Sequence, residues 1–259
     1  MRKIFLVSSI FIGLFFSCQE GNKEITTTAK KNTNEVVFFA NDSLKLYGDL
    51  HVLDKKKPII ILFHQAGANA RGEYNTIIPE LLKEGFNVLA IDQRTGGQSF
   101  GKYNRTVAEI PANRFGYCDA YPDLEAALKY VHDNDFSGKK LIWGSSYSAA
   151  LVIKLGFKNP DSIDGILAFS PASGAPMKGC DPNEYFEKIN TPLLVLRPKR
   201  EMEFESVKNQ FNLAKKYNHQ FYVAENGVHG SSMLVESRTK SNNDETWAAV
   251  KGFLSTFKE

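Results

Sequence analysis

Ser146 is the residue whose surroundings best suit it to covalent chemistry. An apolar run at residues 141–143 is typical of a buried strand, and apolar residues at helical spacing follow from Ala149. The segment between them therefore predicts a sharp turn from strand to helix with Ser146 at its apex. Gly144 and Ser148 are small, which lets the neighbouring backbones approach closely. This is the pattern of a nucleophile elbow, in which a serine hydroxyl attacks a carbonyl carbon.

A serine hydroxyl needs a base that takes its proton, and histidine is the usual one. Three of the five histidines, His51, His132 and His219, lie on an edge hairpin or in polar surface stretches, where a solvated side chain is the simpler explanation. His64 follows a buried strand and has a different expected role. His229 lies in a glycine-punctuated loop after the last expected strand, so we expect it to be the base.

The imidazole in turn needs a carboxylate that fixes its tautomer. The loop after the preceding strand contains Glu201, Glu203 and Glu205 and no aspartate. Glu203 and Glu205 run into the next expected helix, where an exposed charge is the simpler explanation. We therefore expect Glu201 to complete the triad.

These residues must be positioned by a fold in which strands and helices alternate. Such an alternation predicts a mostly parallel sheet of about eight strands with helices on both faces. After an edge hairpin at 36–50, strands are expected at 58–63, 86–91, 141–143, 165–169, 192–196 and 220–224, with helices at 73–84, 122–131, after Ser146, and at 184–189, 205–217 and 245–257. The carboxyl ends of parallel strands share one edge, where ligands bind. Two long connections at this edge, 99–121 and 171–185, are expected to shape a substrate pocket.

The order Ser146, Glu201, His229 resembles the α/β-hydrolase family, in which nucleophile, acid and histidine follow one another in this order. The sequence His-Gln-Ala-Gly at 64–67 is similar to the oxyanion loop of that family, and residues 92–99 are similar to its Asp-x-Arg-Gly-x-Gly-x-Ser turn. The likeness is greatest to small esterases and dienelactone-hydrolase-like proteins. It implies an α/β-hydrolase fold with loop insertions at the catalytic edge.

The same resemblance implies how the oxyanion formed during acyl transfer is stabilised. The backbone donors are expected to be the amides of Tyr147 and Gln65, the first of them at the start of a helix. His64 is expected to brace the oxyanion loop rather than to act as a second base.

The chain departs from the family pattern at three positions. Ser148 replaces the last glycine of Gly-x-Ser-x-Gly, Thr95 replaces a glycine of the turn, and Glu201 stands where aspartate is commoner. The first two changes keep a small side chain for a small one, so we expect the backbone turns to be preserved.

The expected function is hydrolysis of a small-molecule carboxylic ester through an acyl-enzyme on Ser146. A peptidase, a thioesterase or an acyltransferase would use the same residues, and a noncatalytic binding lipoprotein could use the same scaffold. We expect no cofactor and no metal, because no two histidines have ligand spacing such as His-x-x-x-His. The formal net charge is only +3, and two of these charges lie in Arg2 and Lys3, so no nucleic-acid partner is expected.

The N-terminus has the pattern of an export signal over residues 1–17, with a basic start and an apolar run of 13 residues at 4–16. Cys18 follows in a context that resembles a bacterial lipoprotein signal, which implies lipidation at Cys18 and a membrane anchor in the cell envelope, on the periplasmic side or at the outer membrane. An ordinary cleaved signal is the alternative. Residues 18–35 are polar and aperiodic, which predicts a flexible tether, and the hydrolase domain is expected over residues 36–259.

Two further cysteines, Cys118 and Cys180, fall in or beside the two long connections. An exported protein can keep a disulfide. They either form a bridge at the catalytic edge or remain two free thiols.

Overall fold

The computed structural model describes residues 34–110 and 115–258, together with Met1. The chain divides into two units, Met1–Thr33 and Asn34–Glu259. The expected export signal beyond Met1, Cys18 and nearly all of the tether lie outside the described residues. Within the part that is described, no helix combines the length and the apolar character needed to cross a membrane.

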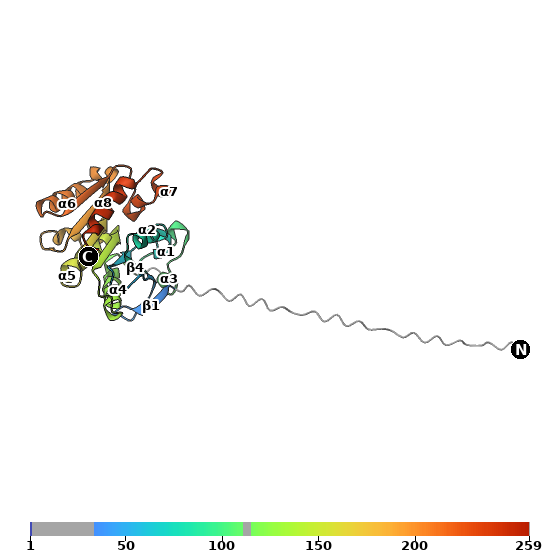
Figure 1. Ribbon diagram of the computed structural model, residues 1–259. Helices are drawn as coiled ribbons and strands as arrows, with labels where there is room; N and C mark the ends of the chain where they lie inside the picture. Colours follow the sequence, from blue (N-terminus) through green and yellow to red (C-terminus); the bar gives the residue numbers. More distant parts are fainter. Residues whose placement is uncertain (2–33, 111–114, 259) are drawn as a thin grey trace. The chain divides into compact units, whose positions relative to one another are not determined.

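An eight-stranded sheet forms the centre of the second unit, in the order β1-β2-β4-β3-β5-β6-β7-β8 (Figure 1). The pairs β1–β2 and β2–β4 are antiparallel, and all other pairs are parallel. The strands are β1 (Glu35–Phe39), β2 (Lys45–His51), β3 (Ile59–Phe63), β4 (Asn87–Asp92), β5 (Lys140–Ser145), β6 (Gly165–Phe169), β7 (Leu193–Pro198) and β8 (Gln220–Ala224). The mostly parallel sheet predicted from the alternation of elements is confirmed.

Helices cover both faces of this sheet. They are α1 (Ala70–Tyr74), α2 (Ile77–Lys83), α3 (Arg105–Ala108), α4 (Tyr121–Asp133), α5 (Tyr147–Lys158), α6 (Glu205–Lys216), α7 (Glu236–Thr239) and α8 (Asp244–Ser255). Successive residues of β3 point to opposite faces. Ile59 and Ile61 join the core formed with α4 and α5, whereas Ile60 and Leu62 join the core formed with α1, α2 and α8. Burial on both faces explains why this strand is a continuous apolar run.

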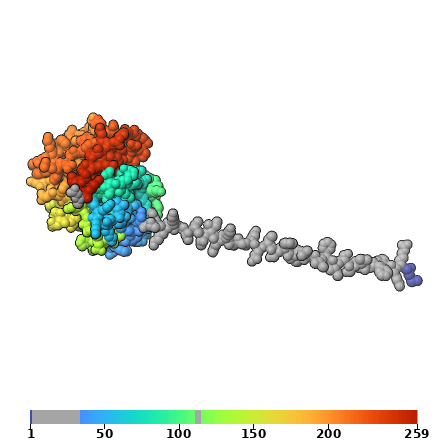
Figure 2. All heavy atoms as spheres, viewed as in Figure 1, coloured from blue at the N-terminus to red at the C-terminus, as the bar shows by residue number. Residues whose placement is uncertain are grey.

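The last helix, α8, packs on the same face of the sheet as α2. Figure 2 shows the C-terminal residues, in red, beside the residues near position 80, in blue-green. Lys251 of α8 and Lys258 both form ion pairs with Glu84, at 3.0 and 2.7 Å. The C-terminal segment is therefore tied to the end of α2 on this face.

Loops leave the carboxyl ends of the parallel strands and meet at one edge of the sheet, and five of them carry residues of interest. The loops after β3, β5, β6, β7 and β8 carry His64, Ser146, Ser170, Glu201 and His229, in this order. The fold thus gathers residues separated by up to 165 positions at the edge expected from the sequence.

Two expected helices differ from the structure. The helix predicted over 73–84 is instead divided into α1 and α2, and Arg238 donates to the carbonyl oxygens of Gly72 and Glu73 near the break. The helix predicted over 184–189 is wrong. That segment forms only a 3₁₀ turn, Pro182–Glu184, and a further turn in which Phe186 is buried.

Cys118 and Cys180 form a disulfide, with their Cα atoms 5.7 Å apart. Cys118 lies in the connection between β4 and α4, and Cys180 lies in the connection between β6 and β7. The bridge therefore joins the two long loops of the catalytic edge.

We predict that the double variant Cys118→Ser/Cys180→Ser unfolds more easily than the wild type. The bridge spans a sequence separation of 62 residues, and its loss is expected to lower the free energy of unfolding by about 2–4 kcal/mol, because the unfolded chain gains freedom. Urea unfolding with a reductant present should bring the wild type to the same value and leave the variant unchanged. Equal stability of wild type and variant without reductant would contradict the prediction.

Candidate active site

Ser146 has a strained backbone between β5 and α5. Its φ and ψ angles are 60° and −118°, a conformation that non-glycine residues rarely adopt. The strand ladder holds it, since the Ser146 amide donates to Phe169 O at 2.8 Å, and Ala149 N donates to Ser146 O at 3.0 Å. A Cβ at position 144 would lie 2.3 Å from Ser148 O, so the turn requires Gly144. The predicted strand, turn and helix around Ser146 are present.

Ser148 explains how the elbow tolerates a residue other than glycine. It is completely buried, and its hydroxyl donates to the carbonyl oxygen of His64 at 2.6 Å. The same hydroxyl lies 3.1 Å from Gln93 Oε1. The side chain that departs from the family pattern therefore ties the elbow to the oxyanion loop.

His229 and Glu201 form a close pair. Glu201 lies in the 3₁₀ helix Lys199–Glu203 after β7, and its Oε1 is 2.6 Å from His229 Nδ1. Because a carboxylate can only accept, Nδ1 carries the proton and Nε2 is left as an acceptor. This is the arrangement that a general base requires.

The loop that carries His229 is attached directly to the strands on either side of the nucleophile. Gly230 N donates to Ser170 Oγ at 3.1 Å, and Ser231 N donates to Ser145 Oγ at 3.0 Å. Gly230 has a φ of +67°, and a Cβ there would lie 2.3 Å from Ser145 Oγ. Only glycine lets the base loop come this close to the elbow.

The Ser146 hydroxyl and the His229 imidazole lie at the same edge of the sheet but are not hydrogen-bonded to each other in the part of the chain that the structure describes. Such catalytic hydrogen bonds commonly shorten when substrate binds. Ser146 is partly accessible and the His229 side chain is 42% exposed, so both are open to a reactant.

Arg197 holds the second oxygen of the acid, and the sequence alone did not indicate this role. Its Nη1 donates to Glu201 Oε2 at 2.7 Å, and its Nη2 contacts Pro171 O and Gln210 Oε1. Burial raises the pKa of Glu201, but hydrogen bonds from His229 and Arg197 outweigh burial and hold that pKa below its ordinary value. Glu201 is therefore ionised at neutral pH. The spacing of four residues between Arg197 and Glu201 is the only signal that could have pointed to the pair.

The two expected oxyanion donors differ in their availability. Tyr147 is the first residue of α5, so its amide has no acceptor within the helix. The Gln65 amide instead donates to Glu73 Oε2 at 2.7 Å and is not free to donate to a substrate oxygen. The expectation for Gln65 is therefore corrected. The next amide, of Ala66, has no hydrogen-bond partner among the described residues.

His64 occupies the bracing position expected for it. It is fully buried; its Nδ1 lies 2.9 Å from Gln65 O, and its Nε2 accepts from Gln93 N at 3.0 Å. Burial lowers the pKa of His64, which favours the neutral ring. Both ring nitrogens are engaged, so His64 is not available as a second base.

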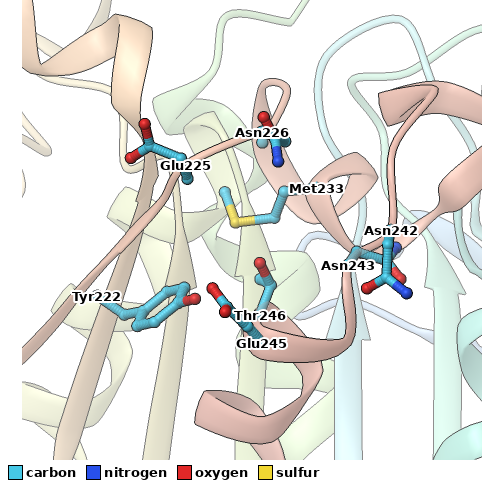
Figure 3. Close-up of a pocket in the computed structure, with 9 residues that line it drawn as sticks. Tyr222, Glu225, Asn226, Met233, Asn242, Asn243, Glu245 and Thr246 are labelled. Atoms are coloured by element: carbon cyan, nitrogen blue, oxygen red, sulfur yellow. The ribbon is translucent and has the colours of Figure 1, made fainter.

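A separate pocket of about 250 Å³ lies beside the loop that carries His229 (Figure 3). It is lined by Tyr222, Glu225, Asn226, Gly227, Met233, Asn242, Asn243, Glu245 and Thr246. Neither Ser146 nor Glu201 nor His229 lines it. Among the residues that the structure describes, no group of three or more His, Cys, Asp or Glu side chains is placed to hold a metal ion.

Comparison with known proteins gives one family and one fold. Residues 54–233 match the family described as serine aminopeptidase, S33. An esterase from Pyrococcus furiosus is similar in structure, with a TM-score of 0.64 and 23% identity over 87% of this chain and 92% of its own. The esterase Est1E from Butyrivibrio proteoclasticus, solved with ferulic acid bound, has a TM-score of 0.66 and 15% identity over 86% of this chain and 98% of its own. No curated protein matches the chain in sequence.

A larger protein also shares this architecture. The acylaminoacyl peptidase of Pyrococcus horikoshii has a TM-score of 0.61 and 14% identity, over 87% of this chain and 42% of its own. At these identities the likeness to solved structures concerns the fold. The α/β-hydrolase fold predicted from the sequence is therefore confirmed.

We predict that Glu201→Gln slows the reaction of Ser146 with a fluorophosphonate by about 10³- to 10⁴-fold, the effect seen when the acid of a serine triad loses its charge. The amide keeps the shape of the side chain but no longer fixes the tautomer of His229. Labelling rates followed by mass spectrometry would measure this. Glu203→Gln is the matched control, because Glu203 is exposed two positions away, and it should label like the wild type. Equal losses in the two variants would overturn Glu201 as the acid.

Proposed function

We propose that this chain, which belongs to the serine aminopeptidase S33 family and has the α/β-hydrolase fold, hydrolyses carboxylic esters through an acyl-enzyme on Ser146. The observation that supports this most directly is the hydrogen bond between His229 Nδ1 and Glu201, at the edge that also carries the strained and partly accessible Ser146. A base with a fixed tautomer beside an accessible serine is the minimum that acyl transfer requires.

In the first half of the reaction, Ser146 Oγ attacks the carbonyl carbon of the ester. His229 Nε2 takes the proton of the hydroxyl, and Glu201 stabilises the imidazolium that forms. The carbonyl oxygen becomes an oxyanion that accepts hydrogen bonds from the amides of Tyr147 and Ala66. When the tetrahedral intermediate collapses, His229 gives its proton to the departing alcohol, and the acyl group remains on Ser146.

In the second half, His229 takes a proton from water, and the resulting hydroxide attacks the acyl carbon. Collapse of this second intermediate returns the proton to Ser146 Oγ and releases the carboxylic acid. The backbone donors of the oxyanion do not need to reorganise as charge develops, and one such donor typically contributes about 2.7–4 kcal/mol to lowering the barrier.

A peptidase is the second candidate, because the matching family is described as serine aminopeptidase. It would use the same triad, and His229 would protonate an amine instead of an alcohol. Parallel assays with p-nitrophenyl esters, a ferulate ester and amino-acid p-nitroanilides would separate the two. If the anilides are turned over faster than the esters, peptidase activity is the function and the esterase proposal is wrong.

We predict that Ser146→Ala lowers kcat/KM for a p-nitrophenyl ester by about 10⁶-fold, as expected when the nucleophile of a triad is removed. The variant should also lose covalent labelling by a fluorophosphonate. Ser255→Ala, at an exposed position on α8, is the control and should retain both. A wild type that neither labels nor turns over would favour a noncatalytic binding protein.

We also propose that the protein is a lipoprotein anchored to the cell envelope through Cys18. The support is the order of a basic start, a short apolar run and a cysteine in residues 1–18. Residues 18–35 would then separate the lipid from the hydrolase domain.

We predict that Cys18→Ser, expressed in a bacterial host, fails to incorporate a labelled fatty acid and moves from the membrane to the soluble fraction. The reason is that the cysteine is the only acceptor for the lipid in this signal. Cell fractionation and metabolic labelling would measure both effects. Retention of the variant in membranes would count against lipidation.

A further inference from the structure

Glu73 is a fully buried carboxyl directly behind the oxyanion loop. It lies in α1, has no exposed surface, and its Oε2 accepts from Gln65 N at 2.7 Å. Its Oε1 lies 3.4 Å from Gln65 Nε2. A buried carboxylate is costly unless such donors surround it. The triad does not include Glu73, so these contacts need another explanation.

The short helix that carries Glu73 is fixed on several sides. Ala70 N donates to Asp92 Oδ1 at 2.8 Å, and the side chain of Asn69 accepts from Gly72 N at 2.7 Å. Arg238 donates to Gly72 O at 2.7 Å and to Glu73 O at 3.1 Å. The carboxylate therefore projects from a rigid support towards the loop.

These contacts determine the direction of the neighbouring amide. Glu73 holds the N–H of Gln65, and the ring of His64 lies 2.9 Å from the carbonyl oxygen of Gln65. That carbonyl shares a planar trans peptide with the N–H of Ala66, so the two groups point in opposite directions. Because both the N–H and the carbonyl of Gln65 are held, the direction of the Ala66 N–H is fixed as well. This N–H is the amide without a partner among the described residues.

We propose that Glu73 is a positioning residue that holds the oxyanion loop so that the Ala66 amide points to the developing oxyanion. This inference rests on the proposed acyl transfer at Ser146. Glu73 does not touch the substrate and acts only through the loop.

The charges around Glu73 fit this role. Burial raises the pKa of Glu73 to about 7, against the opposing effects of hydrogen bonds from Ser145 and Gln65 and of the charges of Arg238 and His229. Tyr74 and Tyr147 are the other titratable groups that face it, and burial raises the pKa of each phenol well above its ordinary value. Ionisation of Glu73 as the pH rises through 7 strengthens its bond to the loop amide.

The test compares Glu73→Gln with Glu80→Gln and the wild type, using a p-nitrophenyl ester. Glutamine keeps the shape of the side chain and removes the charge that holds the loop. We expect kcat of Glu73→Gln to fall by about 10- to 100-fold with little change in KM, because a small misplacement of a catalytic donor has effects of this size. Affinity for a trifluoromethyl ketone, whose adduct with serine carries an oxyanion, should fall in parallel. Glu80→Gln is the control, because Glu80 lies on α2 and pairs with Lys83 at the surface.

The outcomes separate this inference from the proposed function. An inactive wild type would overturn the proposed function, whereas an active wild type and an unchanged Glu73→Gln would overturn the role of Glu73 alone. A fall in melting temperature with unchanged kcat and inhibitor affinity would also overturn it, since it would show a purely structural role.

Amide hydrogen exchange in the wild type provides a readout that does not need a folded variant. The Gln65 amide should be protected, and the Ala66 amide should become protected only when the trifluoromethyl ketone is bound to Ser146. An unprotected Gln65 amide, or an Ala66 amide that the adduct does not protect, would refute the inference.

Discussion

The positive φ angle of Ser146 is the constraint on which the catalytic edge depends. An L-residue in this conformation is strained by about 1–3 kcal/mol and persists only where its surroundings hold it. Here the hydrogen bond to Phe169 O joins the turn to the neighbouring strand, and the close approach of Ser148 to Gly144 leaves no room for another side chain. The strain places the hydroxyl outside the sheet, where other loops can reach it.

Serine hydroxyls connect the loops of this edge. Ser148 joins the elbow to the oxyanion loop, Ser145 and Ser170 accept from the amides of the base loop, and Trp143 Nε1 donates to Ser231 Oγ at 2.8 Å. Small hydroxyl groups allow backbones to pack closely while satisfying buried amides, which are costly to leave unpaired. The base loop is therefore positioned by its backbone, while the imidazole of His229 is left free to exchange protons.

Buried charges support the same edge, each with a partner. Glu201 is held between His229 and Arg197, and Arg105 Nε donates at 2.6 Å to Asp92 at the end of β4, which also accepts from Ala70 N. A charge that is removed from water must be paired, and a paired charge fixes the geometry of its neighbours. The pairing that makes burial of Glu201 tolerable therefore also fixes the position of the His229 imidazole.

The sequence by itself predicted most strands and helices in their order and the elbow at Ser146, because hydrophobic spacing is a local property, and chain order pointed to His229 as the base and favoured Glu201 as the acid over Glu203 and Glu205. It failed at residues 184–189 and 73–84, where Phe186 is buried and the distant Arg238 binds backbone carbonyl oxygens. Only the tertiary structure showed that Glu73 occupies the Gln65 amide and that Arg197 holds Glu201. Such hydrogen bonds depend on the direction in which each backbone and side chain points, and that direction is set by packing between segments far apart in the chain.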